Sequence, residues 1–314
     1  MKKMDKSYLM QNENLIKRRK MRKQIATQIS DPLQRRLIKL GIEQAINFYS
    51  NFFNHTVEKD LNSLVNDYLI VFREAINLGL FQRGGIQEKD HLTLWCLNQV
   101  FKPSTYIESG VFIGSSLHAF LGRENLKSVV LIDPDLSKLR VNINQLNEVQ
   151  LIDDKDFSQL DELFQSATTF AYFDDHIDTA SRITKAAELG IKYVMFDDSN
   201  TVSGLCQRIY PAVPTLQMIT QPELFEVGDI LKWSVGGYSY TRAPQFIKSV
   251  LSALFSGAYS EQEFCFTEEL HNKAQTAKKL MKKLEVVPDL QDYIPQRYPR
   301  GSIDTTKYII ELDV

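Results

Sequence analysis

Residues 105–135 constrain the fold of this chain more than any other segment, because they combine a strand, a glycine turn, a helix and a second strand. The segment begins with an apolar run containing β-branched and aromatic residues, which is typical of a strand. Gly110 and Gly114 bracket a tight turn, and Ser115 or Ser116 can cap the helix that follows. This order of elements is that of half a nucleotide-binding unit.

The second strand of the segment, residues 129–132, ends in Asp133. A carboxylate about 20 residues beyond a glycine turn is placed to accept hydrogen bonds from ribose hydroxyls. The tight turn lets a ligand approach the backbone closely, and exposed amides at the start of a helix favour its polar or anionic end. We therefore expect the ligand to be a derivative of adenosine.

The turn itself, ESGVFIGSS at residues 108–116, has Phe112 where a dinucleotide-binding fingerprint has its middle glycine. It resembles the first motif of class I S-adenosylmethionine (SAM)-dependent methyltransferases, especially catechol and caffeoyl-CoA O-methyltransferases, in which this turn faces the methionine part of SAM. Farther along, DKDFS resembles the family's third motif and implies that Asp156 and Phe157 lie near the adenine. The remaining cofactor contacts that the resemblance implies are Glu108, Ser109, Gly110, Gly114, Ser115 and, at the ribose, Asp133. A glycine turn in another Rossmann-like domain is the alternative.

Three more predicted strands, residues 149–152, 168–173 and 191–196, alternate with predicted helices. Five such strands predict an α/β fold with a Rossmann-like, doubly wound and mostly parallel sheet, in which right-handed crossovers bring the strand ends to one edge. Ligands bind along that edge. The resemblance implies a seven-stranded sheet whose last strand, near residues 306–312, runs antiparallel to the others.

Acidic residues end the predicted fourth and fifth strands, in the motifs FDDH (173–176) and FDDS (196–199). Carboxylates on neighbouring strands, about 4.8 Å apart, repel one another unless a hard cation such as Mg²⁺ binds them. The same strand ends hold a divalent metal in catechol O-methyltransferase-like enzymes and in the macrocin O-methyltransferase and cephalosporin-hydroxylase-like group. The metal ligands that the resemblance implies are Asp175, Asp197 and Asp198, and Asp174 is an implied cofactor contact. Helix capping is the alternative role for such residues.

Catalysis requires a base for the proton of the acceptor hydroxyl. A divalent metal would lower the pKa of that hydroxyl and align its oxygen with the methyl group. His176 has an intrinsic pKa near neutrality and is the candidate base, with Asp175 beside it as a further catalytic candidate. Where the catechol enzymes have a lysine, three residues after the strand-four aspartate, this chain has Asp178. Asp178 is therefore the third catalytic candidate, and capping of the next helix by Asp178 or Thr179 is the alternative.

We expect two regions in the chain. Residues 1–100 form a basic N-terminal arm and a helical region, because apolar residues recur there at helical spacing ahead of the first strand. Residues 101–314 form the methyltransferase-like Rossmann domain. The helical region could cover the sheet, form a homodimer contact or close over the substrate.

Two expectations concern the chain beyond the fifth strand. Residues 200–245 are expected to form an insertion over the acidic edge, with Tyr238, Tyr240 and Arg242 as candidate substrate contacts or as packing residues. Residues 246–284 are expected to return to helix and to end in the basic sequence KKLMKKL.

Charge is concentrated at the N-terminus, where residues 1–40 hold 12 Lys or Arg against three Asp or Glu. The densest part, KRRKMRK at residues 17–23, could contact an anionic lipid or polysaccharide surface, and a solvated helix face is the alternative. Few aromatic residues interleave with these charges, so we expect no nucleic-acid partner. The three widely spaced cysteines and the polar N-terminus favour a reducing, cytoplasmic location.

These features together predict a SAM-dependent O-methyltransferase that acts on a hydroxyl of a small molecule, sugar or cell-surface glycan, with help from Mg²⁺ or another divalent cation. The saccharide acceptor is implied by the resemblance to the macrocin O-methyltransferase group alone. One alternative is a non-catalytic, methyltransferase-like binding or assembly module, because the lysine is missing and Ser199 replaces an Asn of the catechol enzymes. Another metal-dependent reaction on the same fold is the second alternative.

Overall fold

The computed structural model describes residues 20, 23–25, 27–82, 85–122, 124–164, 168–175, 177–197, 213–235, 260–295 and 306–314. Several residues singled out from the sequence lie outside this part of the chain: His176, Asp198, Ser199, Tyr238, Tyr240, Arg242 and most of residues 17–23.

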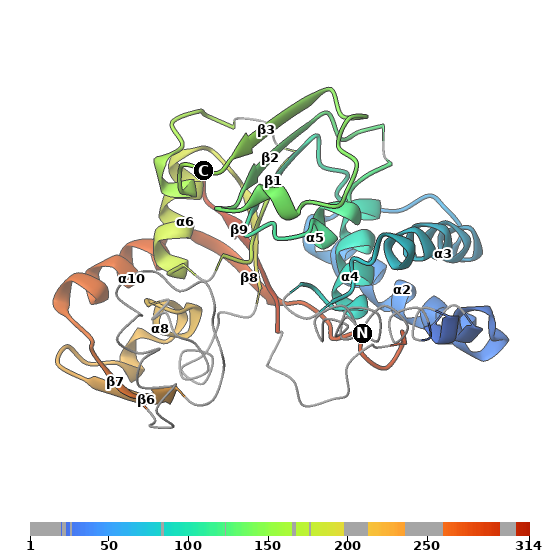
Figure 1. Cartoon of the computed structure of the whole chain (residues 1–314). Helices are drawn as coiled ribbons and strands as arrows, with labels where there is room; N and C mark the ends of the chain where they lie inside the picture. Colours follow the sequence, from blue (N-terminus) through green and yellow to red (C-terminus); the bar gives the residue numbers. More distant parts are fainter. Residues whose placement is uncertain are drawn as a thin grey trace, which may run out of the picture. The chain divides into compact units, whose positions relative to one another are not determined.

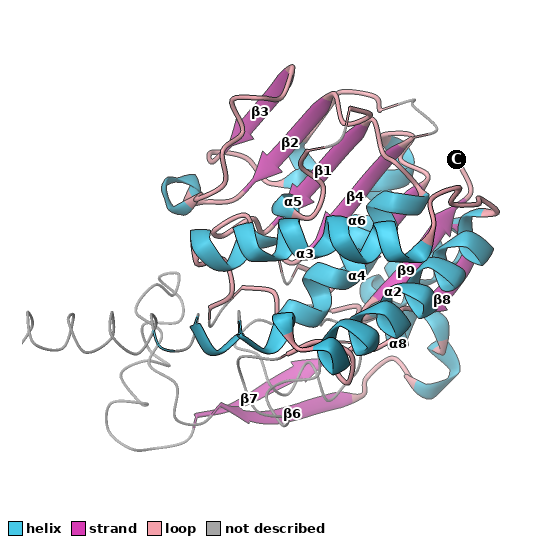
Figure 2. Ribbon diagram, turned by 90° about the vertical axis from the view of Figure 1, so that its right-hand side faces the viewer, coloured by secondary structure: helices cyan, strands magenta, loops and turns pink. Residues whose placement is uncertain are grey.

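A seven-stranded sheet is the main element of the fold, with the strand order β3-β2-β1-β4-β5-β9-β8 (Figure 2). Its strands are β1 (Thr105–Ser109), β2 (Ser128–Ile132), β3 (Glu148–Ile152), β4 (Thr169–Phe173), β5 (Tyr193–Phe196), β8 (Met281–Val286) and β9 (Tyr308–Leu312). β2 runs parallel to β1 and β3, and β4 runs parallel to β5. β9 runs antiparallel to both β5 and β8. The expected doubly wound, mostly parallel sheet with an antiparallel last strand is therefore confirmed.

The sequences of the strands explain their positions in the sheet. All five residues of β4, TFAYF, are buried, as are the last four of β2. Continuous apolar runs of this kind are typical of strands covered on both faces. In β3, EVQLI, only Ile152 is buried, which suits a strand at the edge of the sheet.

Helices precede the sheet, as expected, and those whose full length the structure describes are α2 (Pro32–Phe53), α3 (Leu61–Leu78) and α4 (Glu88–Val100). α2 begins after Asp31, whose carboxylate accepts a hydrogen bond from the Leu33 amide at 2.7 Å, which is an ordinary N-cap. α2 packs against α3 and α4, and every residue of α4 is buried. None of the helices that the structure describes has the length and apolar content needed to cross a bilayer.

Shorter helices connect the strands. They are α5 (Ser115–His118), α6 (Thr179–Glu188), α8 (Leu216–Thr220), α10 (Glu268–Leu280) and the 3-10 helices η1 (Leu136–Lys138), η2 (Phe157–Gln159) and η3 (Pro222–Leu224). α6 follows its N-cap Asp178, whose side chain accepts a hydrogen bond from the Ser181 amide at 2.7 Å. The expected capping of this helix by Asp178 is confirmed, and α6 packs against α10 (Figure 1).

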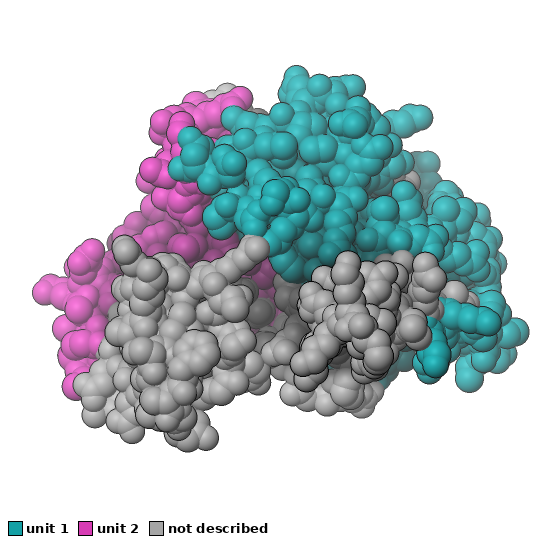
Figure 3. Space-filling model, in the orientation of Figure 1, with its two compact units in different colours: residues 1–154, 287–302 teal, residues 155–286, 303–314 magenta. Residues whose placement is uncertain are grey.

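The chain forms two compact units, coloured separately in Figure 3. Unit 1 comprises residues 1–154 and 287–302, and unit 2 comprises residues 155–286 and 303–314. The glycine turn and Asp133 belong to unit 1, whereas the acidic ends of β4 and β5 belong to unit 2. The division into an arm with a helical region and a Rossmann domain at residue 100 stays a prediction.

The expectation of helix across residues 246–284 is wrong at two places in the described chain. Ser260–Cys265 form β7, which pairs antiparallel with β6 (Ile230–Val235), and Met281–Val286 form β8. α10 lies between β7 and β8, and Lys278 and Lys279 occupy its last turn, as the basic sequence suggested. Pairing of β8 with β9 overrides the helical preference of the lysine-rich sequence, because strand formation depends strongly on cross-strand partners.

Replacing Gly114 by Ala should destabilise the protein more than replacing Gly122 by Ala. Both glycines have a left-handed backbone, with φ of 82° and 75°. A Cβ at Gly114 would lie 2.6 Å from Leu139 Cδ1 and 2.8 Å from Val141 Cγ2, whereas a Cβ at Gly122 would meet no atom within 4 Å. We expect a loss of about 1 kcal/mol for Gly122→Ala and roughly 2 to 3 kcal/mol for Gly114→Ala, measured by urea unfolding. Equal losses would show that the turn tolerates a side chain.

Candidate functional site

The glycine turn of unit 1 joins the end of β1 to the short helix α5. Three of its five residues have left-handed backbones: Gly110 (φ 92°), Phe112 (φ 50°) and Gly114 (φ 82°). The Gly110 amide donates to the Ile132 carbonyl at 2.9 Å, which anchors the turn to the end of β2. A left-handed backbone at an aromatic residue is unfavourable and persists only where the surrounding structure holds it, a situation common in ligand-binding segments.

Asp133 holds this turn in place. One oxygen of its carboxylate accepts from the Phe112 amide at 2.7 Å, and the other accepts from the Asp135 amide at 2.8 Å. Asp133 is partly exposed, and each carboxylate oxygen has a second lone pair. The geometry therefore leaves Asp133 able to accept hydrogen bonds from a ligand while it maintains the left-handed residue Phe112.

Glu108 lies fully buried beneath the turn, at 0% exposure. Its Oε1 accepts a hydrogen bond from the Ser116 hydroxyl, and its Oε2 is buried without a hydrogen-bond partner. Burial raises the pKa of Glu108 from 4.5 to about 8, against the opposing effect of the Ser116 hydrogen bond. Glu108 is therefore mostly protonated at neutral pH.

The serines that follow the turn do not cap the helix. α5 has only four residues, Gly114 is its N-cap, and no side chain accepts from its first amides. The Ser115 hydroxyl donates instead to the Leu80 carbonyl at 2.8 Å, and the Ser116 hydroxyl donates to Glu108. The expected capping by Ser115 or Ser116 is thus wrong, because buried partners in unit 1 take both hydroxyls. Ser109, the last residue of β1, is also buried, and its role as a cofactor contact stays a prediction.

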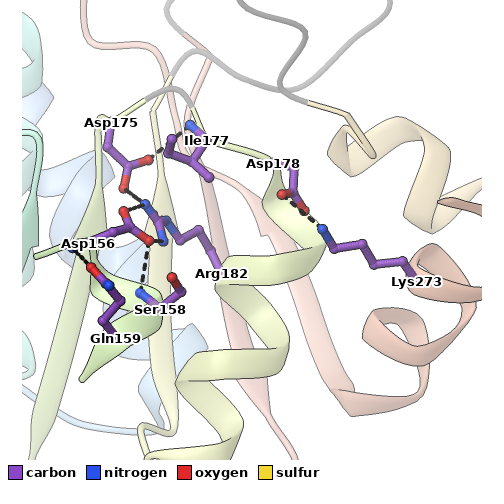
Figure 4. A network of polar contacts seen from close by, with 8 residues as sticks. All are labelled: Asp156, Ser158, Gln159, Asp175, Ile177, Asp178, Arg182 and Lys273. Carbon is purple, nitrogen blue, oxygen red and sulfur yellow. Dashed lines mark hydrogen bonds and ion pairs between the residues drawn. The ribbon is translucent and has the colours of Figure 1, made fainter. Parts of the chain in front are cut away.

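In unit 2, Asp156 and Asp175 are joined by Arg182, a buried residue of α6 that the sequence did not indicate (Figure 4). Its terminal nitrogens bind both oxygens of Asp156, at 2.8 and 2.6 Å. Its Nε donates to Asp175 Oδ2 at 2.9 Å, and Asp175 Oδ1 accepts from the Ile177 amide at 3.1 Å. Burial raises the pKa of Asp156, but hydrogen bonds from Arg182 and Ser158 outweigh it and hold that pKa well below its usual range.

Phe157 was expected beside the adenine of the cofactor, but its ring is packed into unit 2. The residue is completely buried, and its ring meets that of Phe173 edge-on with 4.8 Å between centroids. The Arg182 guanidinium lies 5.6 Å from the centroid of the Phe157 ring, a cation–π distance. The ring thus has no exposed face for stacking on a base, although the adenine contact by this loop stays a prediction.

Asp178 and Lys273 form a second ion pair in unit 2 (Figure 4). Asp178 Oδ2 lies 3.1 Å from Lys273 Nζ, while Asp178 Oδ1 caps α6. A lysine thus lies beside Asp178, and it comes from α10. The catalytic role of Asp178 stays a prediction, and its described contacts are those of a helix cap and a counter-ion.

Asp197, which follows β5, is also paired with a cation. Its Oδ1 accepts from Lys307 Nζ at 2.8 Å, and its Oδ2 accepts from the Tyr172 hydroxyl at 2.7 Å. Only 2% of the Lys307 side chain and 8% of the Asp197 side chain are exposed. Lys307 was not singled out from the sequence. The available signal was its position directly before the last strand, which runs antiparallel and so begins where β5 ends.

The implied metal ligands do not fit a divalent cation in the part of the chain that the structure describes. No group of three His, Cys, Asp or Glu side chains in these residues is arranged to hold a metal. Asp175 binds Arg182 and Asp197 binds Lys307, so both carboxylates are already compensated. Asp198 lies outside the described residues, and Asp174, which is partly buried, follows β4.

Comparisons with known proteins found no matching family model and no matching curated protein. Among solved structures, the chain is similar to an O-methyltransferase from Bacillus cereus in complex with SAH, with 18% identity over 62% of this chain and 94% of that one and a TM-score of 0.34. It is similar to the N-terminal domain of EvdMO1 in the presence of SAH and D-fucose, with 12% identity over 79% and 97% of the chains and a TM-score of 0.37. It is also similar to magnesium protoporphyrin IX methyltransferase (ChlM) from Synechocystis PCC 6803 with bound SAH, with 10% identity over 67% and 73% and a TM-score of 0.32. At these values the likeness adds no argument about function, which has to come from the chain's own residues.

Glu108 should make the protein less stable as the pH rises from 5 to 8. The pKa of Glu108 is about 8 in the folded state and near 4.5 in the unfolded state, so only the folded state keeps the proton in this range. The free energy of unfolding should therefore fall by roughly 1 kcal/mol per pH unit relative to Glu108→Gln, which cannot ionise. Urea unfolding at several pH values measures the difference. Parallel curves for the two proteins would show that Glu108 ionises normally.

Replacing Arg182 by Met should cost about 3 to 5 kcal/mol of stability, because it leaves Asp156 and Asp175 without their cation. Arg182→Lys should recover part of this loss, since an ammonium keeps the charge but lacks the planar fork. Lys185→Met on the same helix is the control. Its ion pair with Glu188, at 3.6 Å, involves a largely exposed carboxylate and should contribute less than about 1 kcal/mol. Similar losses for the two Met variants, measured by urea unfolding, would contradict the proposed importance of Arg182.

Proposed function

We propose that this chain is a SAM-dependent methyltransferase that transfers a methyl group to a hydroxyl of a small molecule or saccharide. The observation that carries the proposal is the left-handed glycine turn between β1 and α5, held by the carboxylate that ends β2. In doubly wound sheets, a turn and carboxylate in these positions are typical of sites for nucleoside-containing ligands. The resemblance of the turn to the first methyltransferase motif selects SAM among such ligands.

The residues of unit 1 supply the cofactor contacts in this proposal. The turn from Gly110 to Gly114 faces the methionine part, and Asp133 accepts hydrogen bonds from the ribose. Glu108 is proposed as a cofactor contact on the resemblance alone. Asp156 and Phe157 are proposed on the same ground to lie near the adenine, through their backbone, because Arg182 already binds both Asp156 side-chain oxygens.

SAM, when bound, supplies an electrophilic methyl group on sulfur. Methyl transfer to an acceptor hydroxyl would require a protein base to take the hydroxyl proton. Asp175 and Asp178 are weak candidates for that base, because Arg182 and Lys273 already bind their carboxylates. We therefore assign the base to His176, whose intrinsic pKa suits the task.

The acceptor, the cellular location and the partners are proposed from the sequence alone. A saccharide hydroxyl is proposed on the resemblance of VFIGSS, FDDH and FDDS to the macrocin O-methyltransferase and cephalosporin-hydroxylase-like group. A cytoplasmic location, a homodimer and contact of residues 17–23 with an anionic surface belong to the same proposal. No divalent cation enters the proposed mechanism, because two of the implied ligands, Asp175 and Asp197, bind Arg182 and Lys307.

Purified protein should bind SAM with micromolar affinity, and Asp133→Asn should weaken binding by roughly 10- to 100-fold, the loss expected for hydrogen bonds to a charged group. Asp135→Asn is the matched control. Asp135 lies two residues away, and its carboxylate pairs with Lys138 at 2.8 Å, so the SAM affinity of this variant should be unchanged. Isothermal titration calorimetry measures both constants, and thermal unfolding checks that the variants are folded.

The reaction itself is tested by mass spectrometry of saccharide and small-molecule acceptors after incubation with SAM. A gain of one methylene in mass per transfer is expected, and His176→Ala should abolish it without changing SAM affinity. If SAM produced neither heat in calorimetry nor thermal stabilisation, the proposed enzymatic function would be wrong. The alternative, a non-catalytic methyltransferase-like binding module, would then stand.

A further inference from the structure

The end of β5 and the start of β9 meet at one edge of the sheet. β9 runs antiparallel to β5, and Phe196 is the register partner of Tyr308. Asp197 follows Phe196 and Lys307 precedes Tyr308, so the topology places these residues opposite each other. Their side chains bind at 2.8 Å. The pair is thus a consequence of strand direction rather than of sequence proximity.

Both members of this pair are buried, and burial makes each dependent on the other. The Lys307 and Asp197 side chains are 2% and 8% exposed, and Tyr172 is fully buried. A buried ammonium or carboxylate is strongly unfavourable unless an opposite charge and hydrogen bonds compensate it. Lys307 binds one oxygen of Asp197 and Tyr172 binds the other. Both oxygens of the Asp197 carboxylate therefore bind protein groups, one of which is a cation.

The end of β4 shows the same arrangement with a different cation. Asp175 Oδ2 lies 2.7 Å from the Arg182 guanidinium, and Asp175 Oδ1 accepts from the Ile177 amide. A divalent cation that bound Asp175 or Asp197 would have to displace a buried guanidinium or ammonium, or lie next to it. A divalent cation about 4 Å from a guanidinium or ammonium would be repelled by several kcal/mol, even at an effective dielectric constant of about 20.

We infer that Lys307 and Arg182 are the resident counter-ions of the carboxylates that end β5 and β4, in the place where a divalent cation was expected, and that the protein works without one. The part of this inference that concerns catalysis rests on the proposed methyl transfer. Lys307 is a positioning residue that fixes Asp197 and Tyr172. Because no metal then lowers the pKa of the acceptor hydroxyl, transfer depends on a protein base.

Thermal unfolding with Mg²⁺ or with a chelator tests the charge balance directly. The wild-type Tm should be the same in both solutions. Lys307→Met should lower the Tm by roughly 5 to 10 °C, since it leaves Asp197 buried without a cation, and millimolar Mg²⁺ should restore part of this loss. The matched control is the double variant with Lys307→Met and Asp197→Asn, which removes both charges. Its Tm should lie above that of Lys307→Met and should not respond to Mg²⁺.

Saturable stabilisation of the wild type by Mg²⁺, abolished by Asp197→Asn, would overturn the inference. If Lys307→Met does not fold, the wild type and Lys307→Arg carry the test, because both keep the cation and neither should respond to Mg²⁺.

SAM calorimetry with chelator and with Mg²⁺ separates this inference from the proposed function. Equal affinity in both solutions supports it, whereas SAM binding only with Mg²⁺ overturns it while leaving methyl transfer in place. Absence of SAM binding under both conditions removes the proposed function but leaves the prediction for Tm standing.

Discussion

A buried guanidinium determines how the strand ends of unit 2 are built. Arg182 extends from α6 and shares its donors between Asp156, which caps η2, and Asp175, which follows β4. A buried cation requires these partners, so the loop at η2 and the end of β4 are held together whenever α6 is packed. The rings of Phe157 and Phe173 complete the surroundings of Arg182. The Arg182 guanidinium on α6 therefore determines the position of the loop at Asp156 and Phe157, the proposed adenine loop, more than the loop's own sequence does.

The parallel strands and the glycine turn could be predicted because local sequence determines them. Short apolar runs such as TFAYF in β4 are typical of strands in a sheet that is covered on both faces. Gly110 and Gly114 supply the positive φ that the turn requires. β8 could not be predicted in this way. Its sequence, MKKLEV, becomes a strand only through pairing with β9, which comes from a distant part of the chain.

Repulsion among the acidic strand ends correctly indicated that positive charge must lie near them, but the sequence did not identify its source. Lys307 is 110 residues from Asp197, and Lys273 is 95 residues from Asp178. No local spacing relates such residues, and only the strand order and the packing of α10 on α6 bring them together. A metal was the simplest cation to infer from carboxylates alone, whereas the described fold provides a guanidinium and two ammonium groups.

The way each carboxylate is compensated also indicates which one is free to act on a ligand. Asp156, Asp175 and Asp197 each bind a cation in unit 2. Asp133 in unit 1 is held by two backbone amides, which fix its orientation. Each of its oxygens keeps a second lone pair at the partly exposed end of β2. That combination suits hydrogen bonds from ribose hydroxyls, and it distinguishes Asp133 from carboxylates whose contacts hold helices and strands together.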